Sequence, residues 1–287
     1  VPSRGLGDVY KRQLLFINKM KDQQSVSYYR TIWISDLHLG TENSKSEMLL
    51  EFLRSTDSKY LFLVGDIIDA WRMKKKIYWH QTHNDIIQKI LRKARKGTKV
   101  IFIPGNHDEL VKSYTSFSLG NISIKNKFTH KLADGRNALV LHGDEFDAVI
   151  LNAKWLASIG SSLYEFILKL NNYLNFVRRK LGLSYWSLSQ FLKHQTKRAT
   201  NFISNFEFAV SDSAKRANAD VVVCGHIHKP IIKKLNGVLY CNDGDWVESC
   251  SALVENNEGQ LSLIDWSIER EKIFQHKHNK LAESVLV

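Results

Sequence analysis

The chain has 287 residues, of which 44% are hydrophobic and 24% charged, and its formal net charge is +12. This length allows one or two domains with a large core. The three cysteines are odd in number and not closely paired, which excludes a disulfide framework, and no apolar stretch approaches the ~20 residues that cross a bilayer. We therefore expect a globular protein of the reducing cytoplasm.

The excess of basic residues favours anionic partners, such as nucleic acid, phosphorylated ligands or an anionic membrane surface. A solvated basic surface would give the same net charge, so charge alone does not choose a partner. Residues 1–13 lack hydrophobic periodicity, and the stretch GLGDVYKRQ at 5–13 resembles translated sequencing-adapter sequence. We expect residues 1–13 to be an artefact or a disordered segment outside the fold.

From about residue 30 the pattern alternates predicted strands with predicted helices. Ser44 and Glu47 have the spacing of a capping box, so we expect a helix to begin at about Ser44, and Gly97 is placed to end the next helix. The predicted elements are a strand at 31–35, a helix from about 44, a strand at 60–64, a helix at 84–95 and a strand at 100–103. This alternation predicts an α/β layered fold.

Further strands are predicted later in the chain. Apolar runs predict strands at 138–141 and 221–224, and the tail has strand-like runs at 237–241, 251–254 and 261–265. A turn signal between the last two runs predicts a hairpin. Because these final strands lack intervening helices, we expect them to form a second sheet packed against the first.

A long helical block separates the strands at 138–141 and 221–224. Apolar residues recur at helical spacing from 148 to 181 and again after Ser187, together with many aromatic and basic residues. The block is too long for a simple connection, so we predict a helical cap insertion at 148–218. The predicted core comprises 30–147 and 219–268, and 269–287 form a C-terminal tail.

Five short clusters of acidic, histidine and asparagine residues each follow a predicted strand. They are Asp36-Leu37-His38, Gly65-Asp66-Ile67-Ile68-Asp69, Gly105-Asn106-His107-Asp108, His142-Gly143-Asp144 and Gly225-His226-Ile227-His228. Together they supply enough carboxylate, imidazole and amide ligands for two adjacent metal ions, which can clamp the attacking and leaving oxygens of a phosphoryl displacement. Ligation by nitrogen and oxygen without thiolate suits Mn²⁺, with Fe²⁺, Zn²⁺ or Co²⁺ as alternatives. The pattern predicts a binuclear metal-dependent phosphoesterase.

Each residue also has an ordinary structural interpretation. An isolated histidine such as His142 would normally be a packed or surface side chain, and Asp69 or Asp108 alone would be a turn former. Only the five clusters, in one order and each at a strand end, favour the metal site over these alternatives.

The clusters D-x-H, G-D-x-x-D, G-N-H-D, an isolated His and G-H-x-H resemble those of the calcineurin-like metallophosphoesterase superfamily, from about Thr31 to Trp266. This resemblance implies a four-layer αββα sandwich, here with the helical cap inserted. The implied ligands are Asp36, His38 and His228 for one ion, Asn106, His142 and His226 for the other, and Asp66 as the bridge. It also implies that His107 protonates the leaving oxygen and that Asp69 orients its ring.

Within that superfamily the chain is most similar to the UDP-2,3-diacylglucosamine diphosphatase family of lipid A biosynthesis. The similarity rests on Trp71 after the second motif, on the helical insertion and on the late triplet Gly244-Asp245-Trp246. It implies cleavage of the pyrophosphate to UMP and a diacylated sugar 1-phosphate. The best-known members have Arg in place of His107 and Glu in place of Asp69, and the G-N-H-D form also belongs to a paralogous branch, so the substrate stays open.

The substrate implied by this resemblance is an anionic nucleotide lipid, and no protein partner is inferred. Basic residues at 72–76 and in the cap would favour peripheral contact with the anionic cytoplasmic face of the inner membrane. We expect most apolar cap residues to pack on each other or on the core. The expected substrate contacts are Arg72, Trp155, Tyr185, Trp186 and Lys193.

Three alternatives remain. A metal-dependent nuclease would use the same ions, with the basic surface binding a nucleic acid backbone. A general phosphodiesterase acting on small nucleotides would need no lipid-binding cap. A metal-free binding scaffold would normally show gaps among the ligand positions, whereas here every position is filled.

Overall fold

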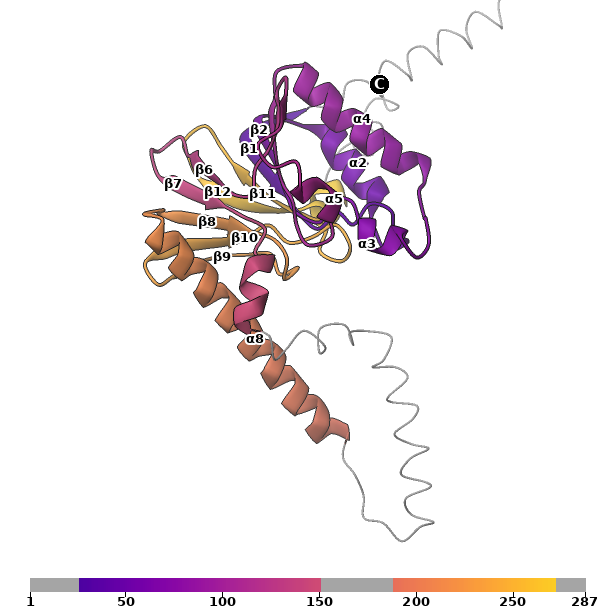
Figure 1. Ribbon diagram of the computed structural model, residues 1–287. Coiled ribbons are helices and arrows are strands. Elements are labelled where there is room, and N and C mark those ends of the chain that lie inside the picture. Colours follow the sequence, from indigo (N-terminus) through magenta and orange to yellow (C-terminus); the bar gives the residue numbers. More distant parts are fainter. Residues whose placement is uncertain (1–25, 151–187, 272–287) are drawn as a thin grey trace, which may run out of the picture.

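The computed structural model describes residues 26–150 and 188–271, and it describes the side chains of all of these except 148–150 and 188–199. Two β-sheets face each other, with helices on both outer surfaces (Figure 1). The helices α2 (Ser46–Ser55) and α4 (Gln81–Arg95) lie on the side of the first sheet, and α8 (Leu188–Arg216) lies against the second. This arrangement confirms the predicted αββα layers.

The first sheet has seven strands in the order β12-β11-β1-β2-β3-β5-β4. Strands β1, β2, β3 and β5 run parallel, whereas β4, β11 and β12 pair antiparallel to their neighbours. The bounds are β1 (Ser27–Ile34), β2 (Thr56–Val64), β3 (Lys99–Ile103), β4 (Ser118–Leu119), β5 (Ile122–Ile124), β11 (Ser251–Glu255) and β12 (Leu261–Asp265). The parallel strands bring their carboxyl ends, and the loops that follow them, to one edge of the sheet.

The second sheet has five strands in the order β6-β7-β8-β10-β9. Strands β7, β8 and β10 are parallel, and β6 and β9 form antiparallel edges. The bounds are β6 (Phe128–Lys131), β7 (Asn137–Val140), β8 (Val221–Cys224), β9 (Ile231–Leu235) and β10 (Val238–Asn242). Strands β7 and β8 point the His142 and Gly225 loops toward the same region as the first sheet.

Three hydrophobic clusters hold the layers together. Trp33 and Phe62 of the first sheet pack with Val140 and Val223 of the second between the sheets. The outer cluster of the first sheet joins its strands to α2 and α4. Burying this much apolar surface is the main favourable contribution to folding.

The described part of α8 beyond residue 200 packs on the outer face of the second sheet. Phe206, Val210 and Ala214 are fully buried with Val222 and Tyr240. The helix is 29 residues long and lies entirely within 148–218, the segment predicted as the cap, yet its part from residue 200 onward covers the core. The division into core and cap stays a prediction, because 151–187 lie outside the described residues.

Two sequence predictions were wrong. The first helix begins at Ser46 and has no side-chain cap, because the Ser44 hydroxyl donates instead to the carbonyl oxygen of Leu37. Of the three tail strands expected in a second sheet, β10 does lie there, whereas β11 and β12 form the predicted hairpin but extend the first sheet beside β1. No helix in the described ranges is long and apolar enough to cross a membrane.

Candidate metal centre

The backbone of the loops is bent sharply where the predicted ligands lie. Five of them have left-handed backbone conformations, with φ of 51° at Asp36, 45° at His38, 53° at Asp66, 69° at His226 and 52° at His228. Such conformations are uncommon outside glycine and persist only where the surrounding structure holds them, as it often does at functional sites. Here the loops hold one another, since the amide of Asp36 donates to the carbonyl oxygen of Gly65 and that of His38 to Asp66, each over 2.9 Å.

Two glycines let these loops approach closely. A β-carbon on Gly105 would lie 2.2 Å from Oδ1 of Asp66, and one on Gly65 would lie 2.1 Å from Nδ1 of His142. Neither position can therefore carry a side chain without displacing a predicted ligand. Steric crowding thus explains why glycine occupies these positions in the second and third motifs.

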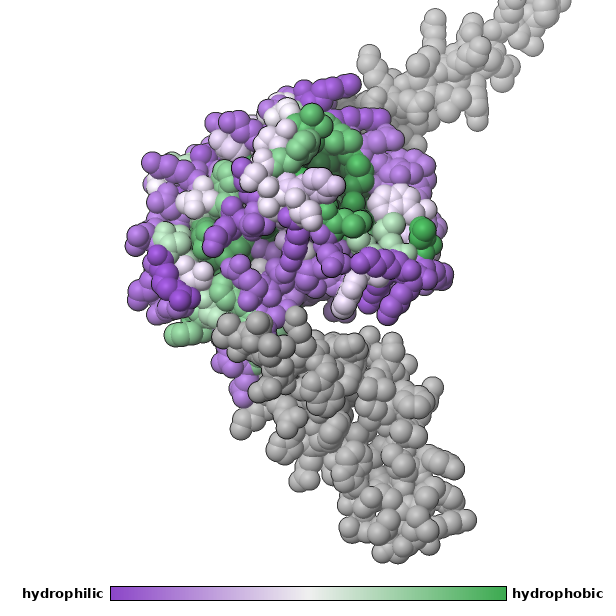
Figure 2. Space-filling view, viewed as in Figure 1, coloured by the Kyte–Doolittle hydropathy of each residue, from purple (hydrophilic) through white to green (hydrophobic). Residues whose placement is uncertain are grey.

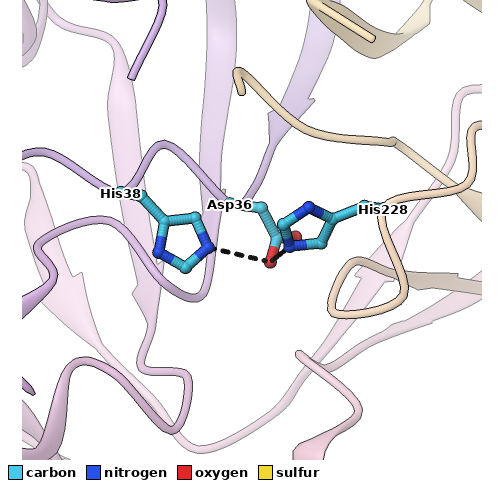
Figure 3. Close-up of side chains that lie close together, drawn as sticks. All are labelled: Asp36, His38 and His228. Atoms are coloured by element: carbon cyan, nitrogen blue, oxygen red, sulfur yellow. Dashed lines mark ion pairs between the residues drawn. The ribbon is translucent and has the colours of Figure 1, made fainter. Parts of the chain in front are cut away.

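The first predicted ligand set is formed by Asp36, His38 and His228. One ligand atom from each lies within 4.8 Å of the others. Nε2 of His228 is 3.0 Å and Nε2 of His38 is 3.9 Å from Oδ1 of Asp36, and Figure 3 shows both rings turned toward that oxygen. The geometry is that of three donors converging on one point.

The second set is formed by Asp66, His142 and His226, again with ligand atoms within 4.8 Å. Nδ1 of His142 lies 2.8 Å from the carbonyl oxygen of Val64, so Nε2 carries the lone pair that faces the site. Nε2 of His226 lies 2.8 Å from Oδ1 of Asp147, which leaves Nδ1 as the available donor. Both arrangements are carboxylate or carbonyl contacts of the kind that orient metal-binding histidines.

Asp66 lies between the two sets. Its Oδ1 is 3.5 Å from Nε2 of His142, and its Oδ2 is 3.9 Å from Nε2 of His38. Burial acts to raise the pKa of Asp66, but the nearby His142 outweighs it and keeps the pKa below its ordinary value. One ionised carboxylate with its oxygens directed at different sets is the arrangement that a bridging ligand requires.

Asp69 holds two histidines at once. Its Oδ1 accepts from Nδ1 of His107 over 2.9 Å and its Oδ2 from Nδ1 of His38 over 3.1 Å. Burial opposes ionisation of Asp69, but these two hydrogen bonds and one from the backbone amide of Arg72 hold its pKa well below the usual range. The sequence predicted the contact with His107 and missed the contact with His38.

Asp108 joins the second and third motif loops. Its carboxylate accepts from the backbone amides of Ile67, Ile68 and Gly105 over 2.9 to 3.1 Å. Burial nevertheless raises its pKa to about 6. The bond pattern identifies Asp108 as a structural bridge between the loops, a role that the sequence alone could not separate from that of a turn residue.

A pocket of about 240 Å³ opens onto both sets and onto His107. The predicted substrate contact Arg72 lines it, together with Thr41, Asn43 and Val247, for which the sequence carries no signal. Trp155, Tyr185 and Trp186 lie outside the described residues, and Lys193 lies in the part of α8 whose side chains are not described. Their substrate contacts stay predictions.

Asn106 provides a direct test of whether these residues fit a metal ion. Its Oδ1 is buried and has no hydrogen-bond partner in the described structure. A buried acceptor without a partner costs about 1–3 kcal/mol, which a cation would relieve. Because Asn106 also lines the pocket, the donor set fits two divalent ions.

The model of the calcineurin-like phosphoesterase family matches residues 29–230 of this chain. The chain belongs to that family. It is therefore a phosphoesterase, a hydrolase whose family implies divalent metal ions. The match spans all five clusters, from Asp36 to His228.

Curated relatives of this phosphoesterase are similar along most of the chain. UDP-2,3-diacylglucosamine hydrolase of Blochmanniella pennsylvanica is 27% identical over 212 residues, covering 71% of this chain and 81% of the relative. The enzyme of the same name from Neisseria gonorrhoeae is 26% identical over 221 residues, covering 75% and 88%. The DNA polymerase II small subunit of Methanothermobacter thermautotrophicus is 22% identical over 290 residues, covering 85% of this chain and 55% of the relative.

Proposed function

We propose that this phosphoesterase hydrolyses the pyrophosphate bond of UDP-2,3-diacylglucosamine, or of a similar lipid-linked nucleotide diphosphate, to UMP and a lipid sugar 1-phosphate. The observation that carries the proposal is the similarity to hydrolases of that name over 71–75% of the chain. The complete set of donors around the pocket supports the chemistry. We propose Mn²⁺ as the preferred ion, since the donors are nitrogen and oxygen without thiolate.

The described side chains divide the chemistry among them. Two bound ions would supply the charge that stabilises the phosphoryl transition state and acidifies a water. Asp69 holds Nδ1 of His107, so the other nitrogen, Nε2, is free to give its proton to the leaving oxygen. Hydrogen bonding to Asp69 and the charge of Asp66 overcome the opposing effect of burial and raise the pKa of His107, which favours the protonated acid. Arg72 at the pocket rim would bind a phosphate of the substrate.

The rim beside the pocket suits a substrate that resides in a membrane. Trp71, Leu110 and Tyr114 are exposed large apolar side chains, with 62%, 67% and 63% of their surface accessible. Lysines 74, 75 and 76 follow Trp71 in the sequence and are exposed. Figure 2 shows hydrophobic side chains gathered between α4 and α5 (Glu109–Lys112) on this face. We propose peripheral contact of this rim with an anionic leaflet, where each unpaired basic residue contributes about 1 kcal/mol. Lys75 has no ion pair in the described structure, whereas Lys74 and Lys76 pair with Glu109 and Glu42.

A metal-dependent nuclease is the second candidate. It is favoured by the similarity to a DNA polymerase small subunit and by the net charge of +12. A nuclease would use the same ions but would bind a phosphodiester backbone with strong salt dependence.

The test is release of UMP from UDP-2,3-diacylglucosamine by Mn²⁺-loaded protein in detergent, beside an aryl phosphodiester and single-stranded DNA. We expect rapid UMP release that the His107→Ala variant loses. The matched control is His80→Ala, an exposed histidine outside the pocket, which should keep the wild-type rate. Cleavage of DNA or the aryl ester without UMP release would contradict the lipid substrate and keep the phosphoesterase.

A further inference from the structure

A second concave surface lies at the other end of the strands that carry the metal centre. A groove of about 560 Å³ opens between the β3–β5 side of the first sheet and β6, the edge strand of the second. Tyr60 and Lys99 line it, and no residue of this lining belongs to the metal-site pocket among the described residues. Tyr60 precedes Asp66 by six residues, so at about 3.3 Å per residue the two sites are about 20 Å apart.

Three cationic groups surround one aromatic ring in this groove. Nζ of Lys59, Cζ of Arg30 and Nζ of Lys99 lie 5.6, 5.7 and 5.8 Å from the ring centroid of Tyr60. At these distances the ring attracts a cation, which holds the three charges together. A fourth cation, Lys131 on β6, also lines the groove.

One acid, Glu255, contacts Arg30 of this set. Its side chain is buried, and its oxygens already accept hydrogen bonds from several groups. Its side chain is completely buried and accepts hydrogen bonds from Arg30, from the Thr31 hydroxyl and from the amide of Ala133, over 2.5 to 2.8 Å. Burial acts to raise the pKa of Glu255, but hydrogen bonds from His130, Thr31, Ala133 and Arg30 outweigh it and lower the pKa. Glu255 is therefore ionised and balances the charge of Arg30 alone.

The other cations keep their charge unbalanced. None of the described residues that line the groove is acidic. The described structure gives no ion pair to Lys59, Lys99 or Lys131, whereas other basic side chains such as Lys93 and Arg136 do have carboxylate partners. Like charges gathered in a concave site repel one another and raise the local affinity for a counter-ion.

We propose that this groove is a second ligand site, distinct from the metal centre, that binds a small phosphate-bearing anion. Its volume lies within the range of small-molecule sites, about 300–1,000 Å³. Lysines act as compact point charges toward phosphate, and Lys99 and Lys131 approach the groove from different sheets. The phosphate belongs to a free soluble ligand or to a lipid headgroup, and both present the same dianionic group. The site is independent of the reaction at the metal centre.

The experiment is a titration of the full chain, loaded with diamagnetic Zn²⁺ and labelled with ¹⁵N, with inorganic phosphate. We expect saturable amide shifts at residues 99–101 and 129–133. The double substitution Lys99→Glu, Lys131→Glu should weaken this binding at least about tenfold, because it reverses both lysine charges that attract the anion. The matched control is Lys234→Glu, an exposed lysine on the opposite edge strand β9, which should leave the affinity within about twofold.

A second arm measures co-sedimentation with phosphatidylcholine vesicles with and without phosphatidic acid. Phosphate shifts in the groove that the Lys99→Glu, Lys131→Glu variant loses support a soluble ligand. Binding only to phosphatidic acid vesicles, lost in the same variant, supports a lipid headgroup. All variants should hydrolyse an aryl phosphodiester at the wild-type rate. The uncharged double variant Lys99→Gln, Lys131→Gln should lose part of the phosphate binding. Equal phosphate and vesicle binding by the double Glu variant and the wild type would overturn the proposal.

Discussion

The carboxylate of Asp69 accepts a hydrogen bond from Nδ1 of His107 over 2.9 Å, and this contact fixes which nitrogen of the ring faces the metal centre. Nε2 of His107 is 3.9 Å from Oδ2 of Asp66, the predicted bridging ligand. Asp69 also holds His38, a predicted ligand. One carboxylate thus couples the proposed general acid to a residue of the first predicted ligand set.

This coupling predicts different losses for two variants. His107→Ala should lower kcat by about 10²–10⁴-fold and keep metal affinity, since it removes a proton donor only. Asp69→Ala should lower kcat similarly and also weaken metal binding by about 10–100-fold, because His38 loses its orienting partner. Metal titrations followed by calorimetry, with initial rates on the same preparations, separate the two. Wild-type metal affinity in Asp69→Ala would contradict the coupling.

A side chain at position 105 should collide with Asp66 in the same centre. A β-carbon there would meet Oδ1 and the backbone nitrogen of Asp66 at 2.2 and 2.6 Å. Gly105→Ala should cost about 1–3 kcal/mol of stability and displace Asp66, weakening metal binding at least tenfold. The control Gly120→Ala meets no atom within 4 Å, and its left-handed backbone should cost only about 1–2 kcal/mol with metal binding intact. Equal metal affinity in the two variants would count against the close-approach explanation.

Phe206 tests whether α8 belongs to the core. Its side chain is completely buried against the second sheet, whereas Phe208 on the same helix is 55% exposed. Phe206→Ala should lower the free energy of unfolding by about 3–5 kcal/mol, and Phe208→Ala should change it by less than about 0.5 kcal/mol. Urea unfolding of both variants gives the comparison. Similar losses would mean that this half of α8 does not anchor to the sheet.

Glu255 predicts a pH dependence of stability. Its pKa in the folded protein lies below the ordinary value of 4.5, so its ionised form stabilises the fold. The contribution is fully present above about pH 4.5 and is lost as the pH falls through the lowered pKa. At pH 7, Glu255→Gln should be less stable than the wild type by about 1–3 kcal/mol, and the difference should shrink steadily below pH 4.5. Unfolding curves from pH 7 to 3 measure it, and a difference that grows on acidification would contradict the assignment.

The sequence predicted the elements and motif loops well because these depend on local signals. Strand 261–265 has the predicted bounds, and the ligand loops follow β1, β2, β3, β7 and β8 as expected. What failed depends on contacts between distant residues. The hairpin signal does not specify that Glu255 pairs with Thr31, so β11 was assigned to the wrong sheet.

The same dependence on distant contacts explains which features of the site the sequence did not predict. Ser44 has the spacing of a cap, yet its hydroxyl reaches the carbonyl of Leu37 because the preceding loop folds back over it. Thr41, Asn43 and Val247 carry no metal-ligand signal, and only the folded loops bring them to the pocket. The second contact of Asp69, with His38, likewise links two motifs that lie 31 positions apart.

We expect two metal ions held by these loops to drive phosphoester hydrolysis. Metal content per chain and the rate of hydrolysis should be measured on wild type and Asp66→Ala, before and after exhaustive chelation. We predict two ions per chain in the wild type, fewer in Asp66→Ala, and turnover that disappears with the ions and returns when Mn²⁺ is restored. Undiminished hydrolysis by metal-free protein would contradict the two-metal mechanism, and two tightly bound ions in Asp66→Ala would contradict the bridging role of Asp66.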